Sequence, residues 1–313
     1  MVRPLVYILV LNWNSPAYTV RCVESLLHLH YSNYRILLID NGSTDGSEAV
    51  LRARFPDLAF LQTGDNLGYA GGNNRGVAYA LERGADYLWI LNNDTCVDPR
   101  ALEALVEAVE KDEGIGLAGS KIRSMDDPDR LVFAGGQIDF WQGKSFHRGH
   151  LEADSGQYDR LEDVSFVTGC SLFFRASLIE QVGLMRETYF LYCEDVEWNL
   201  RIQKAGYRTV YVPGSVLWHK EGGSAGTTRA ERLHPDVVYY CARNGLYFFK
   251  EAFPVPQRWT ASLWHLFENF RLLVSLFRRR DPRFAEYSHS VFQAFADYCN
   301  RVSGRRQKRL AGD

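Results

Sequence analysis

Two amides and a carboxylate follow an apolar run in the first third of the chain. Residues 87–91 are continuously hydrophobic, and Asn92, Asn93 and Asp94 come directly after them. Such a run predicts a buried parallel strand, and open α/β folds place their ligands at the carboxyl edge of the sheet. A carboxylate there can hold a hard divalent cation that neutralises phosphate oxygens. The stretch predicts a metal-bound diphosphate, although a turn or helix cap alone would also explain it.

Three acids form a second group with chemical potential. Glu194, Asp195 and Glu197 open a predicted helix, where carboxylates suit the positive end of the helix dipole. We expect Asp195 to point into a cleft as a general base, while Glu194 or Glu197 orients neighbouring groups. Capping of the helix would also account for these acids. Glu197 and Arg201 stand at i and i+4, so an ion pair is the default interpretation of those two.

A histidine precedes a small turn later in the chain. His219 is followed by Lys220 and then by Gly222, Gly223 and Ser224. A single histidine is more often structural or solvent-exposed than a ligand. The exposed backbone N–H groups of a Gly-Gly-Ser turn could, however, hold a diphosphate. We therefore predict that His219 is a metal ligand.

Strands and helices alternate along the chain, with polar residues after the strands. Strands are predicted over 6–11, 34–39, 58–61, 87–92, 115–119, 166–174 and 209–212. Helices are predicted over 16–29 and 99–111. A further helix should end near residue 83, and another should start near residue 176. This alternation predicts an α/β fold with a mostly parallel, Rossmann-like sheet and helices on both faces. Polar loops follow the first, second and fourth strands, so they should converge on one edge, as a nucleotide site requires. The glycines near position 70 match neither G-x-G-x-x-G nor the Walker pattern, which weakens the case for a dinucleotide or ATP-driven enzyme.

Composition excludes several classes of protein. The chain has 313 residues, of which 46% are hydrophobic, and 36 basic residues nearly balance 38 acidic ones. We therefore expect a globular protein without a nucleic-acid partner. Its six cysteines lack CxxC spacing, which favours reduced thiols over a zinc site or disulfides. The apolar segment 5–11 is too short for a signal peptide, and no run reaches the roughly 18 to 20 apolar residues of a membrane span, so a cytoplasmic protein is expected.

Two regions depart from the alternation. Residues 123–163 predict an inserted loop or hairpin bordering the site, where aromatics such as Trp141 could stack on a sugar or merely anchor the loop. The sequence from about 231 predicts a C-terminal helical region, appended to a main domain of residues 1–230. Its apolar residues recur at three- and four-residue steps and form one hydrophobic helical face. That face could pack on the main domain or lie on an anionic membrane, as the basic residues suggest (Arg278, Arg279, Arg280, Arg301, Arg305, Arg306, Lys308 and Arg309).

With these motifs in order, the chain resembles the family 2 glycosyltransferases, which have the GT-A fold, and within them the bacterial rhamnosyltransferase-like branch. The resemblance runs from about Val6 to Gly226. It places Asn12 and Asn14 at the family's first nucleotide loop and implies that Asp40 binds the pyrimidine base. The other donor-binding residues it implies are Gly42, Ser43, Asn66, Gly68, Gly72, Asn73, Asn92, Asn93, Gly222, Gly223 and Ser224.

The resemblance also implies roles for the acids and the histidine. The triplet Asn92-Asn93-Asp94 corresponds to the metal-binding D-x-D of the family, but an asparagine replaces its first carboxylate. Only Asp94 is therefore carried over as a ligand, and the ion should bind more weakly or depend on substrate phosphates. Asp195 corresponds to the catalytic base, with Glu194, Glu197 and Trp141 as supporting or acceptor-side residues. His219 resembles the metal-coordinating histidine of some members.

The chemistry so implied is inverting transfer of a sugar from a UDP- or dTDP-sugar, dTDP-rhamnose being slightly preferred. The acceptor would be a hydroxyl of a glycan or lipid-linked acceptor in cell-surface glycan synthesis. Mg²⁺ or Mn²⁺ held by Asp94 and His219 would stabilise the departing diphosphate, and Asp40 would read the imide N–H of uracil or thymine. Two rivals remain, a sugar-phosphate nucleotidyltransferase and a non-catalytic nucleotide- or glycan-binding module. A homo-oligomer and peripheral contact with the inner face of the cell membrane stay open.

Overall fold

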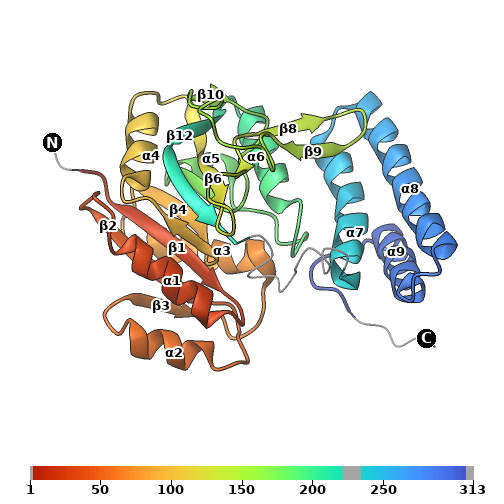
Figure 1. The fold of residues 1–313 in the computed structure, drawn as a ribbon, viewed down its shortest axis with the longest axis horizontal. Helices are drawn as coiled ribbons and strands as arrows, with labels where there is room; N and C mark the ends of the chain where they lie inside the picture. Colours follow the sequence, from red (N-terminus) through yellow and green to blue (C-terminus); the bar gives the residue numbers. More distant parts are fainter. Residues whose placement is uncertain (1–2, 221–233, 308–313) are drawn as a thin grey trace.

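A mixed, mostly parallel sheet forms the centre of the computed structural model, which describes residues 3–220 and 234–307. Its strands run in the order β10-β12-β6-β11-β4-β1-β2-β3, and β1 pairs in parallel with both β2 and β4. The predicted α/β class is confirmed (Figure 1). The strand bounds are β1 Val6–Asn12, β2 Tyr34–Asp40, β3 Ala59–Gln62, β4 Tyr87–Asn92, β6 Ile115–Ser124, β10 Glu162–Asp163, β11 Ser171–Arg175 and β12 Arg208–His219.

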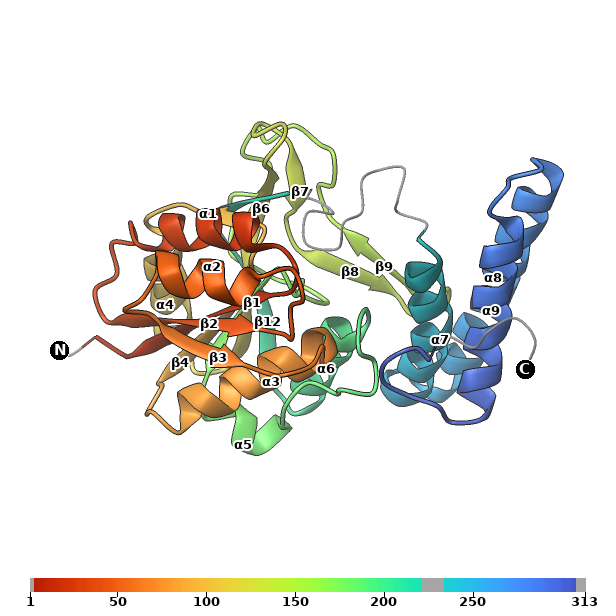
Figure 2. The ribbon, with the colours of Figure 1, turned by 90° about the horizontal axis from the view of Figure 1, so that it is seen from below.

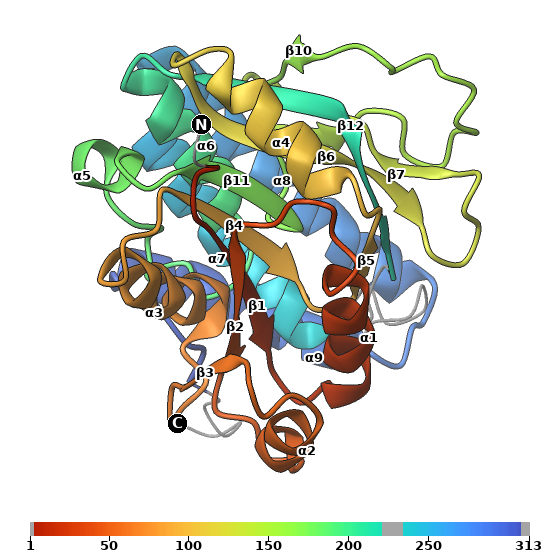
Figure 3. The same ribbon diagram turned by 90° about the vertical axis from the view of Figure 1, so that its left-hand side faces the viewer.

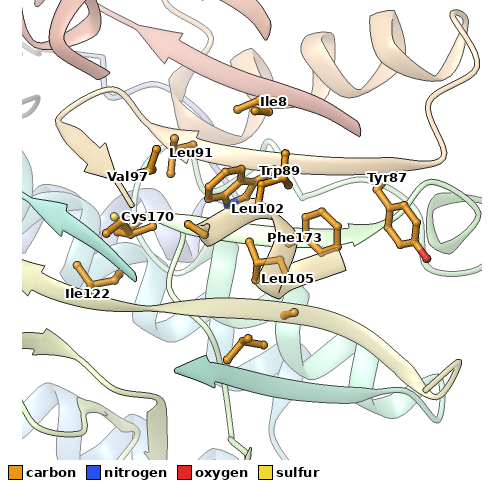
Figure 4. Close-up of a cluster of buried hydrophobic side chains, with 14 of the residues drawn as sticks. Ile8, Tyr87, Trp89, Leu91, Val97, Leu102, Leu105, Ile122, Cys170 and Phe173 are labelled. Atoms are coloured by element: carbon orange, nitrogen blue, oxygen red, sulfur yellow. The ribbon is translucent and has the colours of Figure 1, made fainter. Parts of the chain in front are cut away.

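Helices cover both faces of this sheet because successive strand residues point to opposite sides. Ile8 of β1 packs in one core with residues of α1 and α4, whereas its neighbour Leu9 packs in a second core with residues of α3 and α6. Figure 3 shows the helices on either side of the strands, and Figure 4 shows Trp89 and Phe173 within the first core. The helix bounds are α1 Pro16–Leu26, α2 Ser47–Arg54, α3 Gly68–Leu81, α4 Ala101–Glu110, α5 Leu178–Val182 and α6 Glu194–Lys204.

The last strand of the sheet, β12, is much longer than the predicted strand 209–212. It pairs in parallel with β6, and its register shifts between Val212 and Val216, where Pro213 and Gly214 interrupt the ladder. Beyond this irregularity it continues and pairs antiparallel with β5 (Thr95–Val97). The extension carries His219 to a position opposite Thr95.

The segment 123–163 forms short strands and one hairpin, as the hairpin alternative predicted. The hairpin consists of β8 (Gly136–Asp139) and β9 (Lys144–His147), and β7 (Leu131–Phe133) pairs with β6. The ammonium of Lys121 lies 3.0 Å from the carboxylate of Asp154, and both side chains are buried. This ion pair fastens the segment to the sheet.

Three helices follow the main domain: α7 (Pro235–Ala252), α8 (Val255–Arg278) and α9 (Phe284–Cys299). Phe248 and Phe249 of α7 belong to the first core, so this helix packs back on the main domain. Figure 2 shows α8 and α9 at the end of the molecule away from the first strands. In the described part of the chain, no helix combines the length and apolar character that a membrane crossing needs. All six cysteines are free thiols.

Candidate active site

A hydrogen-bonded chain of buried polar side chains joins the carboxyl ends of β1, β2 and β4. The amide of Asn93 donates to the hydroxyl of Thr19 at 2.8 Å, and this hydroxyl donates to Asn12 at 2.7 Å. Asn12 in turn donates to Asp40 at 2.8 Å. The parallel register, which places Asn12 opposite Asp40, makes the last contact possible. The polar residues that follow three predicted strands therefore do meet at one edge.

Asp40 organises its own loop. It is fully buried, and its carboxylate accepts hydrogen bonds from Asn12, from the hydroxyl and backbone N–H of Ser43, and from Gln62. A carboxylate has about four acceptor positions, so these donors fill it. The expected contact between Asp40 and a base is not available in this arrangement, because one of these donors would first have to leave.

The neighbouring loop residues are held by local bonds. The backbone N–H of Asn14 donates to the Ser43 hydroxyl at 2.9 Å, and the Asn14 side chain accepts from the N–H of Thr44 at 2.8 Å. The N–H of Gly42 donates to Gln62 at 3.3 Å. These contacts fix the loops after β1 and β2 against each other.

A pocket of about 600 Å³ opens beside this edge. Four of the predicted donor residues line it, namely Asn66, Gly68, Asn92 and Asn93. Gly68 has φ +75°, and a Cβ there would lie 2.2 Å from the carbonyl oxygen of Phe190, so only glycine fits. The other lining residues are Leu11, Trp13, Asn41, Tyr69, Phe190, Leu191, Tyr192, His234, Asp236, Val237, Tyr240, Arg305 and Arg306.

Two other predicted donor residues lie behind the pocket wall. Asn73 is fully buried, and its amide donates to the carbonyl of Tyr69 at 3.0 Å. A Cβ on Gly72 would lie 2.6 Å from the side chain of Leu11, so this glycine allows α3 to approach β1. Both residues shape the loop without lining the pocket.

The predicted metal ligands Asp94 and His219 lie side by side. The Nε2 of His219 is 3.1 Å from Oδ1 of Asp94, and the N–H of Lys220 donates to the Asp94 carbonyl at 2.9 Å. Carboxylate oxygen and imidazole nitrogen are ligands that Mn²⁺ accepts, so this pair fits a divalent cation. No group of three or more His, Cys, Asp or Glu side chains that could hold a metal occurs in residues 3–220 and 234–307. The cation would therefore take further ligands from phosphate and water.

A short turn connects Asp195 to the end of β4. The N–H of Gly169 donates to Oδ2 of Asp195 at 2.7 Å, and the N–H of Asn92 donates to the carbonyl of Cys170 at 3.1 Å. The hydroxyl of Tyr69, which lines the pocket, donates to the carbonyl of Gly169. Asp195 therefore lies at the same edge of the sheet as the Asn92–Asp94 triplet.

Glu194 and Asp195 are adjacent in the sequence, but different groups act on the pKa of each carboxyl. Burial raises the pKa of the Glu194 carboxyl above its usual value, and the charge of Asp195 adds to the rise. Burial also raises the pKa of Asp195, but hydrogen bonds from the N–H groups of Gly169 and Val196 oppose that rise. Oε2 of Glu194 has no hydrogen-bond partner among the described residues. The charge of Asp195 therefore favours the protonated form of Glu194, and the two acids titrate as a coupled pair.

The loop before these acids is strained. Phe190, Tyr192 and Cys193 have φ values of 65°, 68° and 76°, which non-glycine residues rarely adopt. Such strain persists only where the surroundings hold it, and it clusters at functional sites. Two buried side chains of α7, Arg243 and Asn244, supply that support.

Asn244 and Arg243 bind the strained loop through its carbonyls. Asn244 donates to the carbonyls of Tyr189, Leu191 and Tyr192 at 2.7–2.9 Å. Arg243 donates to the carbonyl of Tyr189 at 3.1 Å and belongs to the same buried cluster. Sequence reasoning missed both residues, although an arginine and an asparagine within an aromatic helix were a visible signal.

The C-terminal tail also reaches the pocket. The guanidinium of Arg306 lies 2.7 Å from Asp236 of α7, and that of Arg305 lies 3.0 Å from Asp65. Both arginines line the pocket. These two charges are therefore already paired, and Lys308 and Arg309 lie outside the described residues.

The remaining predicted site residues lie elsewhere or are not described. Glu197 is buried and paired with Arg201 at 3.0 Å, which confirms the expected ion pair. Trp141 is exposed at the tip of the β8–β9 hairpin and does not line the pocket. The turn of Gly222, Gly223 and Ser224 lies outside the described residues.

Comparison with known proteins shows the family. The model of the family described as "Glycosyltransferase like family 2" matches residues 3–234. An N-acetylglucosaminyl-diphospho-decaprenol L-rhamnosyltransferase of Mycobacterium tuberculosis is 32% identical over 252 residues, which cover 72% of this chain and 78% of that protein. The galactofuranosyltransferase GlfT1 of the same species is 26% identical, with 79% and 81% covered.

Solved structures show the fold. The mannosyltransferase PcManGT from Pyrobaculum calidifontis, in complex with GDP-Man and Mn²⁺, matches with a TM-score of 0.61 at 15% identity, over 96% of this chain and 88% of that one. GalNAc-T7 with UDP, GalNAc and Mn²⁺ matches with a TM-score of 0.59 at 15% identity, over 77% of this chain and about half (48%) of that one. The fold, the meeting of the motifs at one sheet edge and the matched family agree, and the chain belongs to the family 2 glycosyltransferases, with a GT-A fold.

Proposed function

We propose that this glycosyltransferase moves a sugar from a nucleoside-diphosphate donor to an acceptor hydroxyl with inversion at the anomeric carbon. The observation that carries the proposal is the turn at Gly169 and Cys170. It binds Asp195 on one side and the end of β4 on the other, and it contacts Tyr69 in the wall of the pocket. Asp195 itself does not line the pocket, but this turn links it to Tyr69 and Asn92, which do.

Asp195 acts as the general base in this mechanism. Its carboxylate takes the proton of the acceptor hydroxyl as that oxygen forms a bond to the anomeric carbon. The bond from that carbon to the diphosphate oxygen breaks at the same time, and the nucleoside diphosphate leaves. A single displacement needs one base, which matches a pair of acids in which the charge of Asp195 favours the protonated form of Glu194. Neutral Glu194 keeps a second negative charge away from the base.

Asp94 and His219 hold the divalent cation in this proposal. A bound Mn²⁺ or Mg²⁺ supplies charge neutralisation for the departing diphosphate. The short separation of the two side chains supports their joint role. The structural neighbours carry Mn²⁺ in their complexes, which agrees with a metal-assisted transferase.

We further propose a UDP- or dTDP-sugar as donor and a lipid-linked glycan as acceptor. The relative that transfers L-rhamnose acts on a decaprenyl diphosphate sugar by its name, which favours dTDP-rhamnose and a lipid-linked acceptor. Base recognition through Asp40 would require Asn12, Ser43 or Gln62 to release its carboxylate. Asn41 and Asn66 also line the pocket, but the Asn41 amide donates to Asn66 and Gly68 and accepts from Leu67, and the Asn66 oxygen accepts from Asn41 and Gly68.

Slow donor hydrolysis tests the proposal. The protein is incubated with Mn²⁺ and a panel of UDP-, dTDP- and GDP-sugars, and release of nucleoside diphosphate is followed. We expect release from a pyrimidine nucleotide sugar and its loss in Asp94→Ala. Release from GDP-sugars alone would overturn the donor assignment, and an unchanged rate in Asp94→Ala would overturn the metal site. The anomeric configuration of a transferred sugar, read by NMR, decides between inversion and retention.

A further inference from the structure

Helix α8 exposes large apolar side chains along one face. Seven residues of this face are between 41% and 67% exposed: Val255, Trp259, Leu263, Leu266, Phe267, Phe270 and Phe277. Their spacing of mostly three or four residues places them on one side of a helix. We call these seven residues the outer face of α8.

The opposite side of α8 packs on the protein through small, polar and apolar residues, and Leu276 is buried in a core cluster with residues of α7 and α9. Ala261 is fully buried, and the ring of His265 makes a hydrogen bond to the carbonyl of Ala242 in α7 at 3.0 Å. A surface helix of a globular protein normally buries its apolar side and exposes its polar side. α8 departs from this pattern because its exposed side is apolar as well, and a contiguous exposed apolar surface of this kind marks an interaction site.

The outer face lies at an accessible end of the molecule. α8 packs on α7 and α9, and Figures 1 and 2 show it on the far side of α7 from the central sheet. Phe292 of α9, which is 65% exposed, adds a further aromatic to this end. The pocket is separate, since no residue of α8 lines it.

The charges beside the outer face are almost all positive. From Val255 to Arg280 the sequence has five arginines and one acid, Glu268, which is paired with Arg271 at 2.6 Å. The exposed Arg278, Arg279 and Arg280 have no ion-pair partner among the described residues. A partner for this surface should therefore be apolar and should carry negative charge at its rim.

We propose that the outer face of α8 docks on an anionic lipid bilayer. Tryptophan, phenylalanine and leucine side chains suit the boundary between headgroups and acyl chains, and arginines attract lipid phosphates. A helix of 24 residues is about 36 Å long, so it would lie in the plane of the interface. A second copy of this chain is a less suitable partner. Two outer faces of α8 in contact would bring unpaired arginines together, and the face has no unpaired acid to complement them.

Vesicle binding of the full-length protein tests this proposal independently of donor or acceptor. Flotation is measured with phosphatidylcholine vesicles and with vesicles that also contain phosphatidylglycerol, at low and high salt. We expect binding to the anionic vesicles that weakens with salt. The double variant Leu263→Glu, Phe267→Glu should lose at least about tenfold in partitioning, since it places charge in the apolar layer. Replacing Arg278, Arg279 and Arg280 by Gln should lower partitioning to anionic vesicles by a similar or larger factor.

A matched control uses exposed apolar residues at the other end of the molecule. Leu27 and Val50 are 52% and 48% exposed, so Leu27→Glu, Val50→Glu adds the same charge away from α8. It should bind vesicles like the unmodified protein, and unchanged nucleotide binding shows that each variant is folded. Equal binding by the α8 variant and this control would overturn the proposal. So would a dimer in sedimentation analysis that dissociates in the α8 variant while no form binds vesicles.

Discussion

The imidazole of His219, at the end of β12, lies 3.1 Å from the carboxylate of Asp94, which stands in the turn between β4 and β5. Their contact depends on the extension of β12 past its register shift until it pairs with β5. The proposed metal site depends on this contact between His219 and Asp94.

The first prediction concerns metal affinity. His219→Gln should weaken Mn²⁺ binding in the presence of UDP about 10- to 100-fold, because it removes one of two protein ligands. Asp94→Asn should weaken it at least as much, and a chelator should abolish donor hydrolysis. Calorimetric titration of Mn²⁺ measures the affinities. His28→Gln, at an exposed histidine, is the matched control and should bind Mn²⁺ normally.

The second prediction separates the two acids. Asp195→Asn should lower kcat by about 10²- to 10⁴-fold with little change in the donor KM, because it removes the base. Glu194→Gln should keep most of the activity, since Gln resembles the protonated acid that burial favours. Steady-state kinetics with a transferable acceptor measures both. If Glu194→Gln is the inactive variant instead, the assignment of the base is wrong.

The third prediction follows from the raised pKa of Asp195. The base must be deprotonated, so kcat/KM should rise with pH through a value above that of an ordinary aspartate. The charge of Asp195 favours the protonated form of Glu194, so Glu194→Gln should leave this acid limb nearly unmoved. A pH profile of kcat/KM for both proteins measures the effect. An acid limb at or below about pH 3.9 would contradict the raised pKa.

The fourth prediction concerns how the raised pKa of Glu194 makes the stability of the folded protein depend on pH. Glu194 has a folded-state pKa above its unfolded value, so the folded protein binds more protons between the two values. Its contribution to stability is therefore present at low pH and is lost as pH rises through the folded pKa. Relative to Glu194→Gln, the unmodified protein should become less stable from about pH 5 to pH 8, as thermal melts would show. Thermal melts of Glu82→Gln, at an exposed acid, serve as the matched control.

The fifth prediction tests the support of the strained loop by α7. Asn244→Ala leaves the carbonyls of Leu191 and Tyr192 without this donor and should cost on the order of 1–3 kcal/mol in the free energy of unfolding. It should also lower kcat more than it raises the donor KM, because the loop leads into Asp195. Denaturant unfolding and kinetics measure the two effects. Asn300→Ala, at an exposed asparagine, should change neither.

Local sequence patterns were enough to predict most of the strands and helices and the class of enzyme. Continuous apolar runs specify the buried strands, and β4 spans the predicted residues because Tyr87–Leu91 is buried while Asn92 begins the polar edge. The residue types at 94, 195 and 219 predicted a metal-bound diphosphate and a general base, the resemblance implied a glycosyltransferase, and the matched family confirms a glycosyltransferase. Such inferences succeed because they depend on periodicity and on local side-chain chemistry.

The contacts that hold these groups in place could not be read from local sequence. The sequence shows Asp40 as a free acceptor, but four donors from three other parts of the chain fill it once the strands align. It shows α7 as a separate helical region, but Asn244 and Arg243 hold the loop that presents Asp195. It shows a basic tail, but Arg305 and Arg306 find carboxylates across the pocket. Apart from Ser43, which is three residues from Asp40, these partners are far apart in sequence, so no local pattern encodes them, and only packing of the whole chain brings them together.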